Sequence, residues 1–119
     1  MDMSVLIVDD HAPFRASARR MLELDGFDVV AEAEDGASGL ALAEALEPEL
    51  VLLDVALPDL SGFEVAERLA ATSDVAVVLV SSRDPVDFGK RLARSPVRGF
   101  IPKHELSCEA IASLLGSGE

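Results

Sequence analysis

Five short apolar segments recur along the chain, and most of them are rich in Val, Ile or Leu. They occupy residues 5–8, 27–33, 50–53, 75–80 and 99–101. Apolar runs of this length, separated by more polar stretches, are typical of buried β-strands. Because the runs are almost continuously apolar, rather than apolar at every second position, they favour strands that are covered on both faces of a sheet.

Helix-length segments lie between these runs. The first is expected to begin near Pro13 and to stop at Gly26, since proline fits a first helical turn and glycine often follows the last one. The second and third, residues 37–46 and 63–71, are expected to be amphipathic. The second carries Leu40, Ala41 and Glu44, and the third is expected to turn Ala66, Leu69 and Ala70 inward.

A fourth helix is predicted to begin at Asp84 and to bury Phe88 and Leu92, although its stretch is polar and contains Gly89. A fifth begins after Ser107, whose hydroxyl suits an N-cap. Strands that alternate with helices predict an α/β fold with a doubly wound, mainly parallel sheet, because each helix forms the crossover between two strands. No repeat or linker divides the sequence, so residues 1–119 are expected to form one domain.

The net charge of the chain limits the kinds of partner that it can bind. Its 22 acidic and 10 basic residues give a formal net charge of −12, which would repel a nucleic-acid backbone. A single cysteine, Cys108, cannot form an internal disulfide, and the N-terminal residues do not resemble a signal peptide. The longest apolar run is too short to cross a bilayer. We therefore expect a cytoplasmic protein that binds neither nucleic acid nor membrane directly.

Polar residues follow the predicted strands at the ends where ligands bind in such sheets. Asp9 and Asp10 follow the first strand, Asp54 the third and Ser81 the fourth, while Lys103 follows the fifth. If the first and third strands are neighbours, three carboxylates converge, and a pair about 4 Å apart would repel by about 4 kcal/mol at an effective dielectric constant of about 20. A bound cation would relieve that repulsion.

The chemistry of these groups favours a hard cation and a phosphoryl group. Carboxylate oxygens favour Mg²⁺ or Mn²⁺ over zinc, and few ligands leave room for water and a phosphate. His11 and His104 are expected to be solvated loop residues, since imidazole suits softer metals. A carboxylate that faces a divalent cation, the Lys103 ammonium and the Ser81 hydroxyl is well placed to accept a phosphoryl group.

Four stretches carry a resemblance to the receiver domain of two-component response regulators, over the whole chain: "VLIVDDHAPFR", "PELVLLDVALPDLSGFEVAERL", "VVLVSS" and "GFIPK". The resemblance implies a flavodoxin-like fold with strand order 2-1-3-4-5. It also implies that Asp54 accepts the phosphoryl group, and that Asp9 and Asp10, together with Asp54 and the Ala56 backbone carbonyl, hold Mg²⁺, or alternatively Mn²⁺.

The same resemblance gives roles to further residues. It implies that Ser81 binds a phosphoryl oxygen, that Lys103 pairs with the phosphate, and that Phe100 is the aromatic residue that changes rotamer on activation. Packing alone would account equally well for Phe100. Pro58 and Gly62 match the turn that follows the phosphoryl acceptor and shape the start of the third helix.

The sequence departs from the family pattern in three places. Ser82 stands where a small residue such as alanine is usual after the strand-four hydroxyl, and its side chain is expected to narrow or repolarise access to the phosphate. The stretch Ser95-Pro96-Val97 replaces the usual Ala-Gly-Ala, and the fourth helix is polar and interrupted by glycine, so the usual signalling face is expected to be altered. Pro102 precedes Lys103 instead of following it, so the bond before His104 is expected to be trans and Ile101–Pro102 is left open as a cis bond.

The resemblance implies a sensor histidine kinase or phosphotransfer protein as phosphoryl donor, and a downstream protein or a second copy of the chain as the receiving partner. The "DDH" and "GFIPK" stretches are most similar to receivers that precede helix-turn-helix DNA-binding domains. The chain is therefore expected to be either a stand-alone receiver or the N-terminal receiver of a longer transcription regulator. The protein would act as a switch that catalyses only its own phosphotransfer and dephosphorylation.

Three other classes compete with this hypothesis. A phosphatase of the haloacid dehalogenase type needs a second acid two residues after its nucleophile, where this chain has Ala56. A flavodoxin-like cofactor binder should have a Ser- and Thr-rich loop after the first strand, where this chain has Asp9 and Asp10. An unphosphorylated pseudo-receiver that acts as a scaffold typically lacks an acid, the hydroxyl or the lysine, and none is missing here.

Overall fold

The computed structural model describes residues 3–116, and its centre is a five-stranded sheet in which every pair of neighbours is parallel. The strands are β1 (Ser4–Val8), β2 (Asp28–Ala33), β3 (Leu50–Asp54), β4 (Ala76–Ser81) and β5 (Gly99–Pro102). Their order across the sheet is β2-β1-β3-β4-β5. The predicted fold class and strand order are both confirmed.

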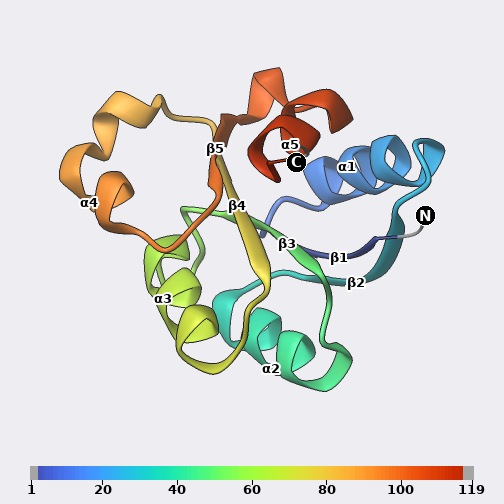
Figure 1. The fold of residues 1–119 in the computed structure, drawn as a ribbon, viewed down its shortest axis with the longest axis horizontal. Helices are drawn as coiled ribbons and strands as arrows, with labels where there is room; N and C mark the ends of the chain where they lie inside the picture. Colours follow the sequence, from blue (N-terminus) through green and yellow to red (C-terminus); the bar gives the residue numbers. More distant parts are fainter. Residues whose placement is uncertain (1–2, 117–119) are drawn as a thin grey trace.

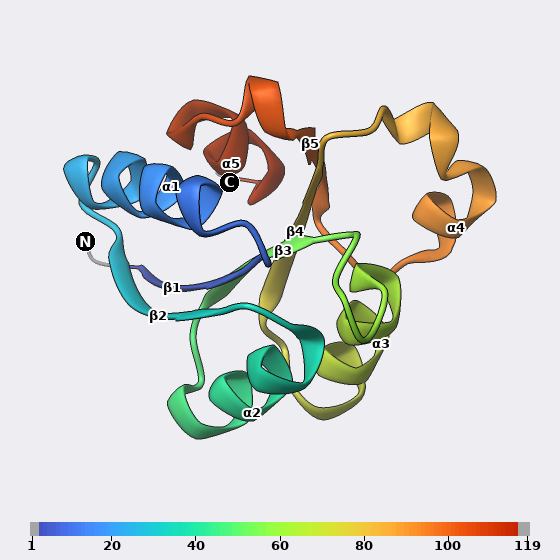
Figure 2. The ribbon, with the colours of Figure 1, turned by 180° about the vertical axis from the view of Figure 1, so that it is seen from behind.

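Helices cover both faces of this sheet. They are α1 (Ala12–Leu24), α2 (Gly36–Leu46), α3 (Gly62–Thr72), α4 (Gly89–Arg94) and α5 (Cys108–Leu114), with two short 3₁₀ turns, η1 (Pro85–Asp87) and η2 (Lys103–Glu105). Helices α1 and α5 pack on one face, and α2 and α3 pack on the other (Figures 1 and 2). Helix α4 lies to one side of the sheet, beyond β5 (Figure 1).

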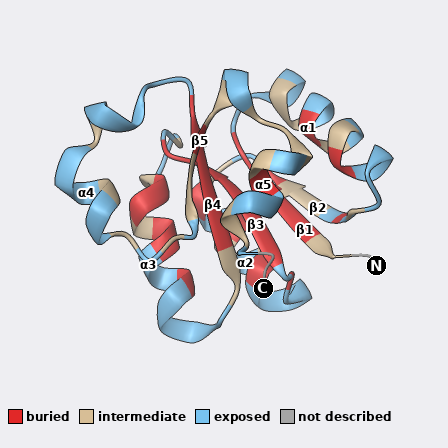
Figure 3. Ribbon diagram, turned by 45° about the horizontal axis from the view of Figure 1, so that its top comes forward, coloured by how far each residue is buried: buried red, intermediate tan, exposed pale blue. Residues whose placement is uncertain are grey.

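The three central strands are buried on both faces, which explains their continuous apolar sequences (Figure 3). In β1, Val5 and Ile7 face the α1 and α5 layer, whereas Leu6 and Val8 face the α2 and α3 layer. Alternate residues of one strand thus contribute to two cores. The observed strand bounds lie within one residue of those predicted at each end.

The fourth helix is shorter than predicted. The chain forms η1 first, and α4 then begins at Gly89, whose φ of +52° lies in the left-handed region that favours glycine. Phe88 and Leu92 are half-buried rather than buried, so that part of the prediction is wrong. Phe88 precedes α4 and Leu92 lies within it, and both pack against the outside of the core on the α2 and α3 side, so each keeps part of its surface exposed.

Two details of the other helices also differ from the sequence prediction. Ala70 of α3 is exposed, so its predicted inward position is wrong. Helix α2 approaches the sheet through Gly39, where an added Cβ would lie 2.9 Å from a methyl carbon of Val8. It buries Gly36, Gly39 and Ala43, while Ala41 and Glu44 are exposed. Small residues, rather than a stripe of leucines, therefore set the contact between α2 and the sheet.

All peptide bonds within residues 3–116 are trans, so the bond before His104 is trans as predicted and Ile101–Pro102 is trans as well. Across the same residues, the helices are all too short or too polar to span a lipid bilayer.

Candidate functional site

The predicted site residues gather at the carboxyl edge of the sheet. Asp9 follows the last residue of β1, Asp54 ends β3 and Ser81 ends β4. Ser81 is in register with Pro102 of β5, so Lys103, the next residue, lies near the end of β4. Asp9, Asp54 and Ser81 are the buried polar residues among those described, with 0%, 4% and 2% of their surface exposed.

Lys103 joins the two buried carboxylates. Its Nζ lies 2.7 Å from Asp9 Oδ2 and 3.6 Å from Asp54 Oδ2. The contact with Asp9 is an ion pair that lacks hydrogen-bond geometry. The same ammonium lies 4.4 Å from the centre of the Phe14 ring, which adds a cation–π contact from α1. The positive charge is thus nearer to Asp9 than to Asp54.

Asp54 is hard to ionise in this position. Its burial, together with the negative charge of Asp9, raises its pKa from 3.8 to about 6. The Lys103 charge and the backbone N–H of Ala56, which donates to Asp54 Oδ1 at 3.3 Å, oppose that rise in pKa only in part. Asp10 adds a smaller repulsion. A further positive charge would therefore stabilise the ionised form.

The acidic pair has the chemistry of a cation site. Ligand atoms of Asp9, Asp10 and His11 lie within 4.8 Å of one another; Asp9 is buried, and Asp10 and His11 are exposed. Asp9 Oδ1 accepts a hydrogen bond from His11 N at 2.8 Å, while Oδ2 is buried without a hydrogen-bond donor. Two hard carboxylates beside a third, Asp54, fit Mg²⁺, whereas the exposed His11 imidazole adds little affinity for such an ion.

Ser81 ends β4 and Phe100 lies in β5, the positions that the sequence predicts. The two side chains have different neighbours. The Ser81 hydroxyl oxygen accepts a hydrogen bond from Arg83 N at 3.0 Å. The half-buried Phe100 ring lies 5.5 Å from that of Phe88, which lies 5.4 Å from Phe63. A row of three aromatic rings thus connects β5 with α3, and any rotation of Phe100 would disturb its contact with Phe88.

Asp59, which the sequence analysis does not single out, fixes the loop after Asp54. The Asp59 carboxylate accepts hydrogen bonds from Gly36 N at 2.7 Å and Ala37 N at 2.9 Å, at the start of α2. These bonds hold the pKa of Asp59 below its usual value. An acidic residue in a turn hints at a cap, but its partners lie more than twenty residues away in the chain, and only the tertiary structure reveals them.

Gly62 explains why the same loop needs a glycine. An added Cβ would press on the backbone carbonyl oxygen of Asp54 and lie 2.8 Å from Val55 Cα. Gly62 N also donates to Val55 O at 2.7 Å. The start of α3 is therefore in direct backbone contact with Asp54, for which the family resemblance implies the role of phosphoryl acceptor.

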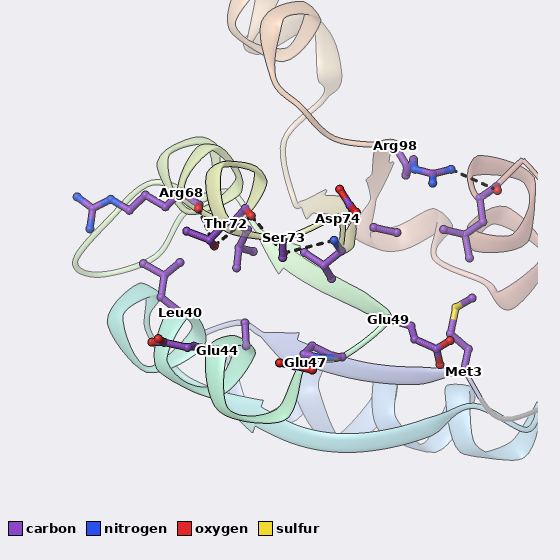
Figure 4. Close-up of a pocket in the computed structure, with 16 residues that line it drawn as sticks. Met3, Leu40, Glu44, Glu47, Glu49, Arg68, Thr72, Ser73, Asp74 and Arg98 are labelled. Atoms are coloured by element: carbon purple, nitrogen blue, oxygen red, sulfur yellow. Dashed lines mark hydrogen bonds between the residues drawn. The ribbon is translucent and has the colours of Figure 1, made fainter.

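A separate hollow of about 840 Å³ lies at the opposite end of the sheet, where the strands begin (Figure 4). Glu47 and Glu49 line one side, and Thr72 and Ser73 at the end of α3 line another. None of the predicted site residues reaches this hollow. It therefore has no part in the acidic site.

The comparisons with known proteins identify the family. The response regulator receiver domain matches residues 5–114. The chain is 38% identical over 108 residues to the transcription regulator of virulence factors BvgA of Bordetella pertussis, covering 90% of this chain and 52% of BvgA. It is 30% identical over 113 residues to the DNA-binding transcriptional activator EvgA of Escherichia coli, covering 94% and 55%.

A solved structure agrees. The signal receiver domain of the response regulator NarL from Mycobacterium tuberculosis superposes with a TM-score of 0.83 and 31% identity, covering 97% of this chain and 98% of that domain. The chain belongs to the response regulator receiver family of two-component signal transduction. It spans about half the length of the curated relatives it matches. The family resemblance drawn from the sequence is confirmed, and membership decides against the phosphatase and the flavodoxin-like cofactor binder.

Proposed function

We propose that this receiver is phosphorylated on Asp54 by a sensor histidine kinase or a phosphotransfer protein, and that the new charge switches its interaction surface. The observation that carries the proposal is the position of the Lys103 ammonium, which lies 2.7 Å from Asp9 and 3.6 Å from the buried carboxylate of Asp54. A pseudo-receiver that acts only as a scaffold would not need a lysine placed beside both buried carboxylates.

Each residue has a defined part in the transfer. An Asp54 carboxylate oxygen attacks phosphorus, the bond from phosphorus to the donor breaks, and an acyl phosphate forms. Lys103 pairs with the phosphoryl oxygens, and Ser81 donates its hydroxyl hydrogen to one of them. Asp9, Asp10, Asp54 and the Ala56 carbonyl would hold Mg²⁺, or Mn²⁺, which supplies positive charge to neutralise the carboxylates and the phosphoryl group.

The same charges account for the change in the interaction surface after phosphorylation. When the phosphoryl group draws Lys103 and Ser81 toward Asp54, β4 and β5 shift, and Phe100 changes its contact with Phe88. The surface of β4, α4 and β5 then binds a downstream protein or a second copy of the chain. The names of BvgA and EvgA support transcription as the process controlled. With its net charge of −12, this domain would act through another DNA-binding unit. A cytoplasmic location and self-catalysed loss of the phosphoryl group are part of the proposal.

A mass measurement tests the proposal. The protein is incubated with Mg²⁺ and acetyl phosphate, and its intact mass is followed. We expect one added phosphoryl group in the wild type and in Asp74→Asn, a matched change of an exposed acidic residue at the opposite end of the sheet, and none in Asp54→Asn. A wild type that gains no phosphoryl group with Mg²⁺ present, or an Asp54→Asn variant that gains one, would contradict the proposal.

A further inference from the structure

Arg15 of α1 contacts the backbone of the acidic pair rather than its carboxylates. Its Nη1 donates to the Asp9 carbonyl oxygen at 2.6 Å, and its Nε donates to Glu32 Oε1 at 3.0 Å. Both side chains of this pair are largely buried, with 17% and 25% of their surface exposed. The fork of the guanidinium group thus connects β2 to the loop that follows β1.

Glu32 is itself fixed from a second direction. Arg19 Nη1 donates to Glu32 Oε2 at 2.7 Å, and Arg19 Nη2 donates to the backbone oxygen of Val29 at 3.1 Å. Both carboxylate oxygens of Glu32 are therefore occupied by arginines. Glu32 is thus held in place, and it holds the Arg15 guanidinium group where Nη1 reaches the Asp9 carbonyl oxygen.

The carbonyl that Arg15 holds belongs to the peptide unit that joins Asp9 to Asp10. Because a peptide unit is planar, fixing its oxygen also fixes the direction in which Asp10 leaves the strand. Asp9 N donates to Ala33 O at 3.0 Å, so the backbone of Asp9 is held on both sides. The relative positions of the Asp9 and Asp10 carboxylates therefore depend on Arg15.

We propose that Arg15, held by Glu32, is a positioning residue that sets the geometry of the Asp9–Asp10 pair and so its affinity for a divalent cation. This inference rests on the proposed function, since it concerns the cation that phosphorylation of Asp54 would use. Residues that orient metal ligands typically change metal affinity by about 10- to 100-fold when they are replaced.

The sign of the effect separates positioning from simple charge. Arg15 is a cation near a cation site, so a purely electrostatic role predicts that Arg15→Gln binds Mg²⁺ more tightly. A positioning role predicts weaker binding, by about tenfold. Arg15→Lys keeps the charge but cannot span Glu32 and the Asp9 carbonyl with one planar group, so it should also bind more weakly.

The test is a calorimetric Mg²⁺ titration at constant ionic strength, on the wild type, Arg15→Gln, Arg15→Lys and the control Arg68→Gln. Arg68 also forms an ion pair, with Glu64 at 2.6 Å, but on the exposed surface of α3. We expect wild-type affinity in the control and weaker binding in both Arg15 variants. The Asp10 amide signal should shift before Mg²⁺ is added, which general loss of stability would not cause in a folded variant.

The outcomes separate the two proposals. If the wild type binds Mg²⁺ and both Arg15 variants bind it within twofold of the wild type or more tightly, the positioning role is wrong and the proposed function stands. If the wild type itself binds no Mg²⁺, both fail. Should Arg15→Gln not fold, as judged by its thermal unfolding, Arg15→Lys decides alone.

Discussion

The ionised Asp54 carboxylate destabilises the folded protein when no cation is bound, because it is buried and lies close to other negative charges. Its pKa of about 6 in the folded state is above the 3.8 of a free carboxyl, so folding disfavours its ionised form. The difference corresponds to a penalty on the order of 3 kcal/mol, fully present above pH 6 and absent below about pH 4. We therefore predict that Asp54→Asn raises the free energy of unfolding at pH 7.5 in EDTA.

The pH dependence makes this prediction specific. The stabilisation by Asp54→Asn should shrink as the pH falls from 6 to 4, because the wild-type carboxyl then becomes neutral too. Urea unfolding at several pH values measures it. Asp74→Asn, which removes an exposed acid, should change the stability little at any of these pH values. A variant of Asp54 that is less stable than the wild type at pH 7.5 would contradict the argument.

At the scale of single residues, the sequence predicts the site better than it predicts the contacts within it. Asp9, Asp54 and Ser81 come directly at the ends of apolar runs, so their common edge follows from the parallel topology. The preference of Lys103 for Asp9 over Asp54, and the bonds from Asp59 to α2, depend on distances between segments that are remote in sequence. No local pattern encodes such distances.

At the scale of elements, the junction of β3 and α3 depends on the lack of a side chain at Gly62. We predict that Gly62→Ala destabilises the protein by roughly 2 kcal/mol or more, since the new Cβ would meet backbone atoms of Asp54 and Val55 that cannot turn aside. The same displacement should slow phosphorylation of Asp54. Thermal unfolding and the rate of acetyl phosphate labelling measure the two effects.

A matched control for this prediction is Gly26→Ala. Gly26 has a φ of +92° and no atom within 4 Å of an added Cβ, so its replacement costs only the left-handed backbone conformation. That variant should lose some stability but keep its labelling rate. Equal labelling rates in Gly62→Ala and Gly26→Ala would show that the start of α3 does not control the position of Asp54.

The elements themselves could be predicted to different degrees. The sequence predicts the bounds of the central strands to within one residue, because burial on both faces requires an unbroken apolar run. The prediction for α4 is wrong in the length of the helix and in the burial of its side chains, because the helix packs beyond the sheet edge and begins at Gly89, which interrupts the helical pattern. Helix α2 uses small residues for close contact, and small residues give no apolar periodicity to detect.

At the scale of the whole molecule, the net charge of −12 means that any salt stabilises the fold to some extent by screening repulsion. A specific cation site adds a different effect, because an ion that binds only the folded protein raises the free energy of unfolding with its concentration. At a hundred times the dissociation constant the increase is about 2.7 kcal/mol. For a domain of this size, the unfolding temperature should then rise by roughly 10 °C.

At constant ionic strength, screening is about the same in NaCl and in MgCl₂, so a difference in stability between the two salts reports binding of Mg²⁺. We predict that replacing NaCl with MgCl₂ at fixed ionic strength raises the unfolding temperature of the wild type, and that Asp10→Asn removes most of that rise, because Asp10 is an exposed member of the cation site. Differential scanning calorimetry measures both. Asp74→Asn lowers the net negative charge by the same amount while leaving the site intact, so it should keep the response to Mg²⁺. If the wild type, Asp10→Asn and Asp74→Asn respond alike, the stabilisation comes from the overall charge of the molecule and the acidic pair has no special affinity for the ion.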